Sequence, residues 1–255
     1  MRQIKLLMGM PITVEIVDPF VSPAAFDQTY AFLQYVDETF SPFKESSEVT
    51  RISRGELRAD QASPDMQLIL QLAEQTRQET GGYFDVWHKG NFDPCGIVKG
   101  WAIHEAAKRL EREGFRNFYV DAGGDVQVSG TNAQGQPWRV GIRNPFEADR
   151  IVKVLSLTNS GIATSGPYIR GDHIYNPRNE ADRLDQIVSM TVVAGNVYEA
   201  DRFATAAFAM GRDGILFVES LTGLEGYMID RTGRATFTRG FGDYCSMQRA
   251  DQRAE

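Results

Sequence analysis

The sequence predicts an α+β fold in which helices pack against antiparallel or mixed sheets. Stretches with the two-residue period of strands and with the 3.6-residue period of helices both occur. They do not follow the regular strand–helix order of a doubly wound protein. The 255 residues show no internal repeat, low-complexity segment or linker, and 42% are hydrophobic while 24% are charged. We therefore expect one compact domain over residues 1–255.

The chain opens with alternating apolar residues, which is the pattern of a half-buried strand. These residues are Ile4, Leu6 and Met8, followed by Ile12, Val14 and Ile16. The alternation does not fit a secretory signal, which needs an unbroken apolar stretch. No run approaches the roughly 20 apolar residues that span a bilayer. We expect a cytoplasmic protein without a membrane anchor.

Apolar spacing and capping residues indicate the helices. Residues 23–40 carry apolar side chains at helical intervals, and Pro42 follows them. Ser63 and Pro64 form a cap and first turn, and Gly81-Gly82 is a glycine stop. The expected helices span residues 23–40, 64 to about 80, 97–114, 197–210 and 213–222.

Strands are expected between these helices. The predicted segments are Phe118–Val120, Val126–Val128, a pair at 138–142 and 151–157, a buried strand at 187–194, and a closing hairpin of Tyr227–Asp230 and Ala235–Thr238.

The net charge of −7 argues against nucleic acid as the main partner, because such proteins usually carry a basic domain or stripe. An acidic protein that holds a polyanionic nucleotide needs a metal ion, a lysine or backbone amides at that place. Cys95 and Cys245 match no metal-binding spacing, and we expect two thiols in a reducing compartment.

Asp201 and Thr205 lie four residues apart in a predicted helix and so share one face. A carboxylate and a hydroxyl together with nearby carbonyls are the hard oxygen ligands that Mg²⁺ or Ca²⁺ prefers. Such a pair more often forms a solvated face or a capping detail. The spacing alone leaves both interpretations open.

Three other segments are candidates of the same kind. Gly96 and Gly100 flank Lys99 where a loop enters a helix, which suits a phosphate, although the P-loop spacing is absent and an ordinary helix start is the alternative. The turn at 123–124 brings a backbone close to a ligand or forms a simple bulge. His173 is either catalytic or structural.

Taken in order, nine segments resemble one family, the FAD:protein FMN transferases, also called ApbE-like proteins. The resemblance covers most of the chain, in a short form without a lipoprotein segment, and implies an ApbE-like, T-fold-like domain. The segments are Met8-Gly9, FSPFKESSEVTRIS (40–53), TGGYFDV (80–86), DPCGIVKGWAIHEAA (93–107), YVDAGGDV (119–126), WRVGIRNP (138–145), IATSGPY (162–168), HIYNPR (173–178) and SMTVVAGNVYEADRFATAAFAMG (189–211).

The resemblance implies a Mg²⁺ site and a flavin site. The metal would be held by Asp201, Thr205 and the backbone oxygens of Gly96 and Ala204. Asp201 would also help accept a proton, and His173, beside the flavin pocket, is a second candidate proton handler. The implied flavin and nucleotide contacts are Met8, Phe43, Tyr83, Phe84, Asp85, Asp93, Lys99 and Ile174.

The implied reaction cleaves the pyrophosphate of FAD, attaches FMN through a phosphoester to a Ser or Thr hydroxyl of a target flavoprotein, and releases AMP. The alternatives are a Mg²⁺-dependent FAD pyrophosphatase and a non-catalytic flavin or nucleotide binder. The sequence does not decide between Mg²⁺ and Mn²⁺, and it identifies neither the acceptor protein nor the oligomeric state.

The chain departs from the family at the pocket wall. Only seven residues, VWHKGNF, separate Asp85 from Asp93, where the family has a long segment. Phe43 stands where the family usually has tyrosine, so an aromatic ring remains and a hydroxyl is lost. Pro167 replaces a common Asp. The expected metal residues survive these changes.

Overall fold

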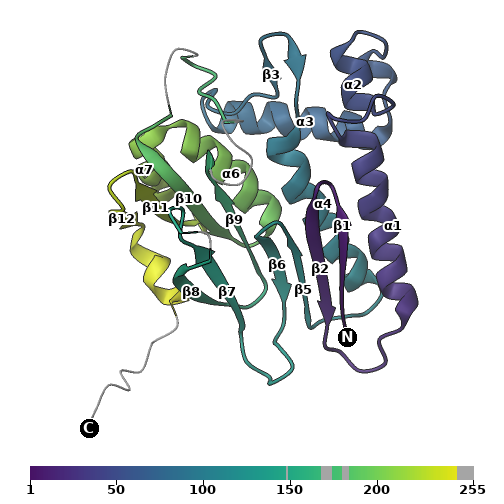
Figure 1. The fold of residues 1–255 in the computed structure, drawn as a ribbon, viewed down its shortest axis with the longest axis vertical. Helices are drawn as coiled ribbons and strands as arrows, with labels where there is room; N and C mark the ends of the chain where they lie inside the picture. Colours follow the sequence, from purple (N-terminus) through teal and green to yellow (C-terminus); the bar gives the residue numbers. More distant parts are fainter. Residues whose placement is uncertain (148, 168–173, 180–183, 246–255) are drawn as a thin grey trace.

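The computed structural model describes residues 1–147, 149–167, 174–179 and 184–245. Within them, eight strands form the main sheet (Figure 1). These strands are β1 (Arg2–Leu7), β2 (Met10–Ile16), β5 (Phe118–Ala122), β6 (Asp125–Ser129), β9 (Ser160–Ser165), β10 (Ile187–Ala194), β11 (Glu225–Asp230) and β12 (Ala235–Phe237). They are neighbours in this order, and every neighbouring pair is antiparallel.

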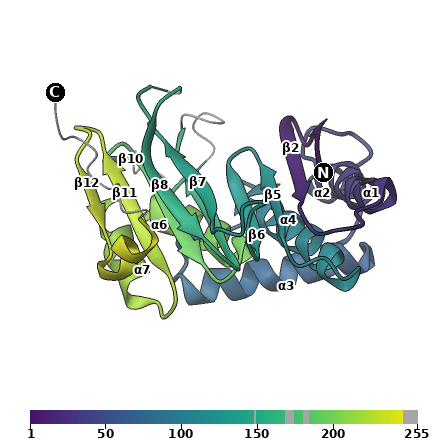
Figure 2. The same cartoon turned by 90° about the horizontal axis from the view of Figure 1, so that it is seen from below.

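Helices cover one face of this sheet, and a separate hairpin covers part of the other (Figure 2). The helices are α1 (Pro23–Phe40), α2 (Glu48–Ser53), α3 (Pro64–Glu79), α4 (Cys95–Arg112), α6 (Val197–Ala209) and α7 (Gly214–Ser220). The hairpin consists of β7 (Trp138–Arg143) and β8 (Ile151–Leu157), and a shorter one of β3 (Trp87–His88) and β4 (Asn91–Phe92). The predicted α+β class is confirmed.

Strand β9 shows how the two layers form. Successive side chains in a strand point to opposite faces. Ile162 accordingly packs with the β7–β8 hairpin, whereas its neighbour Ala163 packs against α6. A third cluster fills the space between α1, α4 and strands β2 and β5. The sheet is therefore buried on both faces at its centre, which holds the ends of β6 and β9 in fixed positions.

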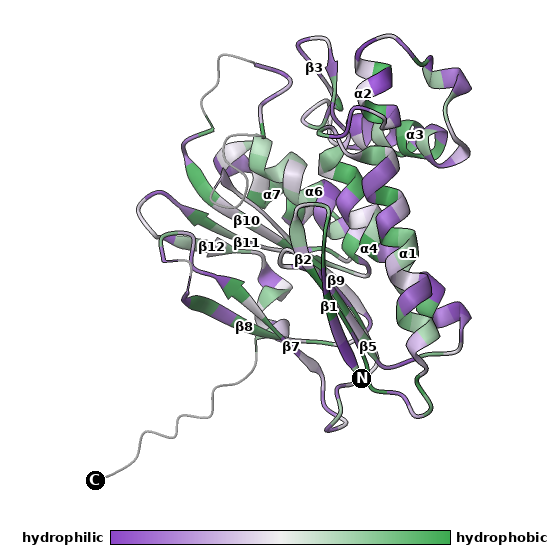
Figure 3. Ribbon diagram, turned by 45° about the vertical axis from the view of Figure 1, so that its right-hand side comes forward, coloured by the Kyte–Doolittle hydropathy of each residue, from purple (hydrophilic) through white to green (hydrophobic). Residues whose placement is uncertain are grey.

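The helices begin where the sequence places capping residues. The Ser63 hydroxyl accepts a hydrogen bond from the Met66 N–H at 3.3 Å, and the Asn196 side chain accepts one from the Glu199 N–H at 2.9 Å. Gly81 and Gly82 end the turn after α3 with φ values of 60° and 85°, which favour glycine. Figure 3 shows apolar and polar residues interleaved along α1 and α4, as expected of amphipathic helices.

The structure differs from the sequence-based prediction in two respects. The first strand is a hairpin of β1 and β2, because Met8 and Gly9 both adopt left-handed conformations, with φ of 53° and 72°, and reverse the chain. The short helix α2 and the strands β3, β4 and β9 were not predicted. That residues 1–255 form one domain stays a prediction.

Among the described residues, none of the helices combines the length and apolar character needed to cross a membrane.

Candidate functional site

The site is built where α4 and α6 cross. A Cβ atom on Gly100 would lie 2.6 Å from the Cβ of Asp201 and 3.0 Å from the Val197 carbonyl oxygen, so only glycine permits this approach. The Gly100 N–H donates to Asp201 Oδ2 at 2.8 Å. In a regular helix this N–H would bond the carbonyl of Gly96. The crossing thus joins the glycine-rich start of α4 to the carboxylate of Asp201.

Lys99 lies between two buried carboxylates. Its ammonium forms an ion pair with Asp125 Oδ2 and lies 3.6 Å from Asp201 Oδ1. The Lys99 side chain is 19% exposed, and those of Asp125 and Asp201 are each 3% exposed. The Thr164 N–H holds Asp125 by donating to Oδ1 at 3.0 Å. Among the described residues, one ammonium thus lies close to two buried carboxylates.

Thr205 and Gly96 meet beside this cluster. A Cβ atom on Gly96 would lie 3.3 Å from the Cγ2 of Thr205 and 3.2 Å from the ring of Phe84. The Thr205 hydroxyl is 3.4 Å from that of Ser165, at the end of β9. Asp201 and Thr205 share a helix face, as the spacing predicts, and this face is turned toward the start of α4.

These residues line a cleft of about 790 Å³, including the part open to solvent. Its walls come from the segment after α3, the start of α4, the end of β9, residues 174–177 and α6. The lining residues are Tyr83, Phe84, Asp85, Asp93, Cys95, Gly96, Lys99, Thr164, Ser165, Gly166, Ile174, Tyr175, Pro177, Asp201 and Thr205.

The structure therefore brings together most of the residues predicted for the site. Nine of them line the cleft: Tyr83, Phe84, Asp85, Asp93, Gly96, Lys99, Ile174, Asp201 and Thr205. Three do not. Met8 lies at the β1–β2 turn against the core, Phe43 is 93% exposed, and Ala204 is buried in the cluster between α6 and the sheet. His173 lies outside the described residues.

Two of the lining carboxylates also organise the backbone. Asp93 Oδ1 accepts a hydrogen bond from the Cys95 N–H at 2.9 Å, which satisfies one of the unpaired donors at the start of α4. Asp85 Oδ1 accepts one from the Trp87 N–H at 2.8 Å, which starts the β3–β4 hairpin. Their positions in the cleft wall thus follow partly from local turn chemistry.

Sequence reasoning did not single out Asp125, Thr164, Ser165 or Tyr175. The first three lie within YVDAGGDV and IATSGPY, two segments that carry the family resemblance. The only sequence signal that could have identified these three residues is that each is polar and lies near the end of a buried strand. The ion pair between Lys99 and Asp125 is a tertiary contact that this signal does not reveal. Tyr175 lies in HIYNPR beside the predicted Ile174.

The turn that precedes Asp125 is fixed by a partly buried carboxyl group, that of Asp121. Asp121 Oδ1 accepts from the Gly124 N–H at 2.8 Å, and the Tyr119 hydroxyl donates to Oδ2 at 3.1 Å. Burial raises the pKa of Asp121 above its usual value, although both hydrogen bonds oppose the shift. Burial also raises the pKa of Tyr119. The pair anchors the turn between β5 and β6.

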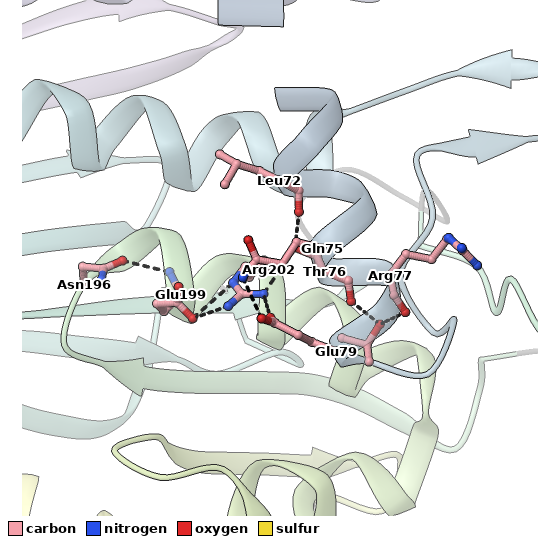
Figure 4. A network of polar contacts seen from close by, with 9 residues as sticks. Leu72, Gln75, Thr76, Arg77, Glu79, Asn196, Glu199 and Arg202 are labelled. Atoms are coloured by element: carbon pink, nitrogen blue, oxygen red, sulfur yellow. Dashed lines mark hydrogen bonds and ion pairs between the residues drawn. The ribbon is translucent and has the colours of Figure 1, made fainter. Parts of the chain in front are cut away.

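Arg202, the neighbour of Asp201, ties α6 to α3 (Figure 4). Its guanidinium donates to Glu199 at 2.6 and 3.1 Å, forms an ion pair with Glu79, and lies 3.3 Å from the Thr76 hydroxyl. The Arg202 side chain is only 5% exposed. This network fixes α6 at the residue next to Asp201, and so limits how the site carboxylate can move.

The sequence matches a known protein family over most of its length. The model of the ApbE family matches residues 8–89 and 87–228. The chain belongs to the ApbE family. The two matched stretches overlap at residues 87–89, in the β3–β4 hairpin.

Curated relatives carry the name FAD:protein FMN transferase. The one from Haemophilus influenzae is 31% identical over 157 residues, which are 58% of this chain and 45% of that protein. The one from Salmonella typhimurium is 32% identical over 150 residues, 55% of this chain and 43% of that protein. The match thus spans less than half the length of these relatives.

Solved structures of the family share the fold. The flavin transferase ApbE from Vibrio cholerae superposes with a TM-score of 0.82 and 20% identity, covering 96% of this chain and 98% of that one. The ApbE protein from Thermotoga maritima gives a TM-score of 0.86 at 20% identity, covering 96% and 99%. An ApbE-like fold is confirmed.

Proposed function

We propose that this protein is a Mg²⁺-dependent FAD:protein FMN transferase, which moves FMN from FAD to a Ser or Thr hydroxyl of a target flavoprotein. The observation that carries the proposal is the meeting of Gly96, Lys99, Asp201 and Thr205 in one cleft of an ApbE-family fold. The names of the curated relatives support the same activity. The acceptor is a protein partner that the chain itself does not identify.

The donor atoms of the site fit a hard divalent cation. Asp201 and Thr205 offer side-chain oxygens, and Gly96 lies beside Thr205 in the first turn of α4, where its carbonyl would be a further oxygen ligand. Ala204 would contribute its carbonyl alone. Among the described residues no cluster of three or more His, Cys, Asp or Glu forms a metal site. Few carboxylates, supplemented by substrate phosphates, are typical of Mg²⁺.

The charge of the cleft supports the same assignment. Its described lining includes three carboxylates, Asp85, Asp93 and Asp201, and one ammonium, Lys99. A pyrophosphate would be repelled by this lining without an added cation. Mg²⁺ held by Asp201, Thr205 and the carbonyl of Gly96 would offset the pyrophosphate charge and the charge that develops on the leaving AMP.

The chain's own residues would bind and orient the reactants. Lys99 would contact the phosphates while Asp125, held by the Thr164 N–H, keeps its ammonium in place. The acceptor hydroxyl would attack the phosphorus on the FMN side in line, forming an O–P bond. The bond from that phosphorus to the bridging oxygen breaks, AMP leaves with this oxygen, and Asp201 accepts the hydroxyl proton.

The flavin and adenosine ends would lie along the walls formed by Tyr83, Phe84, Asp85, Asp93 and Ile174. Met8 and Phe43 remain candidate contacts on the family resemblance alone, as does His173 as a proton handler.

We also place the protein in the cytoplasm. Cys95 and Cys245 are thiols rather than half-cystines, as is usual in a reducing compartment.

The test is turnover of FAD by the purified protein in the presence of Mg²⁺, with and without a flavoprotein that carries a Ser or Thr acceptor. We expect AMP to appear, and flavin to stay on the denatured acceptor. Asp201→Asn keeps the side-chain shape and should reduce AMP release at least about 100-fold. Asp27→Asn, at a side chain 72% exposed in α1, is the matched control.

Each other outcome selects another function. AMP release that needs no acceptor, with no flavin left on the denatured protein, identifies a pyrophosphatase. FAD that stays bound and intact in the presence of Mg²⁺ and acceptor identifies a binding protein. Full activity of Asp201→Asn removes Asp201 from the reaction.

A further inference from the structure

Strand β9 and helix α6 are in contact at both ends of the strand. Near the start of β9, a Cβ atom on Gly161 would lie 2.0 Å from the Val197 nitrogen, so the strand approaches the first turn of the helix at backbone distance. At the end of β9, the Ser165 hydroxyl oxygen lies 3.4 Å from the Thr205 hydroxyl oxygen. Because two points fix the helix along the strand, Ser165 and Thr205 are held opposite each other.

The backbone of Ser165 is fixed by the main sheet. Ser165 is paired with Met190 of β10 in the antiparallel ladder, and the preceding residue, Thr164, donates its N–H to Asp125. Ser165 is 6% exposed and lines the cleft. A short side chain on a fixed backbone has few positions for its oxygen. The Ser165 hydroxyl therefore has a nearly preset place in the cleft wall.

The Thr205 hydroxyl also lies close to the start of α4. A Cβ atom on Gly96 would lie 3.7 Å from Thr205 Oγ1 and 3.3 Å from Thr205 Cγ2. The same oxygen that contacts Ser165 is thus near the glycine-rich turn where the cation is proposed to bind.

A threonine that binds a cation must direct its proton elsewhere. A hydroxyl group carries one hydrogen and two lone pairs, so an oxygen that turns a lone pair toward a cation points its hydrogen away from the cation. The nearby positive charge makes this O–H a stronger donor, and hydrogen bonds assisted by charge are shorter and stronger than neutral ones. Ser165 Oγ is an acceptor already placed at 3.4 Å.

We propose that Ser165 is the positioning residue of Thr205, because its oxygen accepts the Thr205 hydrogen and thereby directs a Thr205 lone pair toward the cation. This inference rests on the proposed function for the cation itself. Ser165 acts through Thr205 and is not a metal ligand. Loss of a partner that orients a metal ligand typically weakens metal binding by about 10- to 100-fold.

The test measures Mn²⁺ binding to the FAD-free protein by electron paramagnetic resonance, since Mn²⁺ takes the oxygen ligands of Mg²⁺. Ser165→Ala should weaken Mn²⁺ binding about 10-fold, whereas Ser165→Thr keeps the hydroxyl and should stay within about 3-fold of the unmodified protein. Ser160→Ala is the matched control. It is the same change at the other end of β9, in a residue 7% exposed whose hydroxyl has no hydrogen-bond partner among the described residues. It should keep the Mn²⁺ affinity.

Two further measurements separate positioning from other roles. In FAD turnover, Ser165→Ala should raise the Mg²⁺ concentration for half-maximal AMP release about 10-fold, with little change in kcat at saturating Mg²⁺, because cation binding is the weakened step. Crystals of the Mn²⁺-loaded protein should show the Ser165 and Thr205 hydroxyl oxygens about 2.7 Å apart. Ser165 Oγ should lie beyond the roughly 2.5 Å of a metal ligand.

The outcomes distinguish this inference from the proposed function. Unchanged Mn²⁺ affinity of Ser165→Ala, equal weakening by Ser160→Ala, a Ser165→Thr protein as weak as Ser165→Ala, or direct coordination of Mn²⁺ by Ser165 overturns the inference alone. An unmodified protein that binds no Mn²⁺ refutes the proposed cation site and the inference with it. A protein that binds Mn²⁺ in the predicted way but releases no AMP refutes the transferase and leaves the role of Ser165 standing.

Discussion

Replacing Gly100 with alanine should push α4 and α6 apart and disable the site. The added Cβ would lie 2.6 Å from the Cβ of Asp201, about 0.8 Å short of the 3.4 Å at which ordinary contact begins. It would also lie 3.0 Å from the Val197 carbonyl oxygen. Both atoms belong to the helix rather than to the flexible end of a side chain. The strain can therefore be relieved only by moving α6 with its carboxylate.

The magnitude follows from two opposing contributions. Overpacking of this kind costs about 1–3 kcal/mol. Alanine favours a helix interior over glycine by about 1 kcal/mol, which offsets part of the cost. The net loss of about 0–2 kcal/mol should lower Tm by at most roughly 8 °C in a chain of this length. The effect on turnover should be larger, about 100-fold, because a shift near 1 Å misplaces Asp201.

The assay pairs thermal or urea denaturation with AMP release from FAD. Gly195→Ala is the matched control, because a Cβ there meets nothing within 4 Å and the position just precedes the Asn196 cap of α6. The control should keep both stability and turnover. A Gly100→Ala protein as stable and as active as the unmodified chain would refute the close approach of the two helices.

Two further predictions concern stability. Arg202→Leu should cost about 2–3 kcal/mol in urea denaturation, less than the ~3–5 kcal/mol of a fully buried pair, because Glu79 and Glu199 are 38% and 30% exposed. Arg58→Leu, at a side chain 74% exposed, should cost almost nothing; equal losses would contradict the role of the network. Burial, with a smaller contribution from Lys108, lowers the pKa of His104 below its usual value of 6.5. The unfolded chain therefore takes up this proton at a higher pH than the folded chain does. As a result, the free energy of unfolding falls as the pH drops below about 6.5. His104→Gln should make that fall shallower in urea titrations between pH 7 and pH 5, and an unchanged slope would contradict the shift.

Local signals predicted the helices well because caps and glycine stops act within a few residues. The expected helix at 23–40 coincides with α1, and Ser63-Pro64 opens α3 as predicted. The first hairpin was missed because the apolar alternation continues through Met8 and Gly9, where no common turn sequence interrupts it. Strand β9 was missed because its segment, SGIATS, is small and polar, and is buried only through its neighbours on the sheet.

The residues of the site likewise fall into those that local sequence signals predicted and those that depend on tertiary contacts. Asp201 and Thr205 were placed on one face by their spacing, and Gly96 and Lys99 were candidates for a phosphate site. The family resemblance then joined the two segments in one site. Neither source reveals that Lys99 pairs with Asp125, or that the Tyr175 hydroxyl reaches the carbonyl of Asp85, 90 residues away. Such contacts are set by sheet order and loop length, which a single sequence does not specify.

The central claim is that one hard cation binds between the start of α4 and the face of α6 that carries Asp201 and Thr205. The most direct measurement is anomalous scattering from crystals grown with FAD and Mn²⁺, which substitutes for Mg²⁺ among oxygen ligands. The account predicts a single strong peak within about 2.5 Å of the side-chain oxygens of Asp201 and Thr205. A Mn²⁺ ion bound elsewhere, with no density between Gly96 and Asp201, would contradict it.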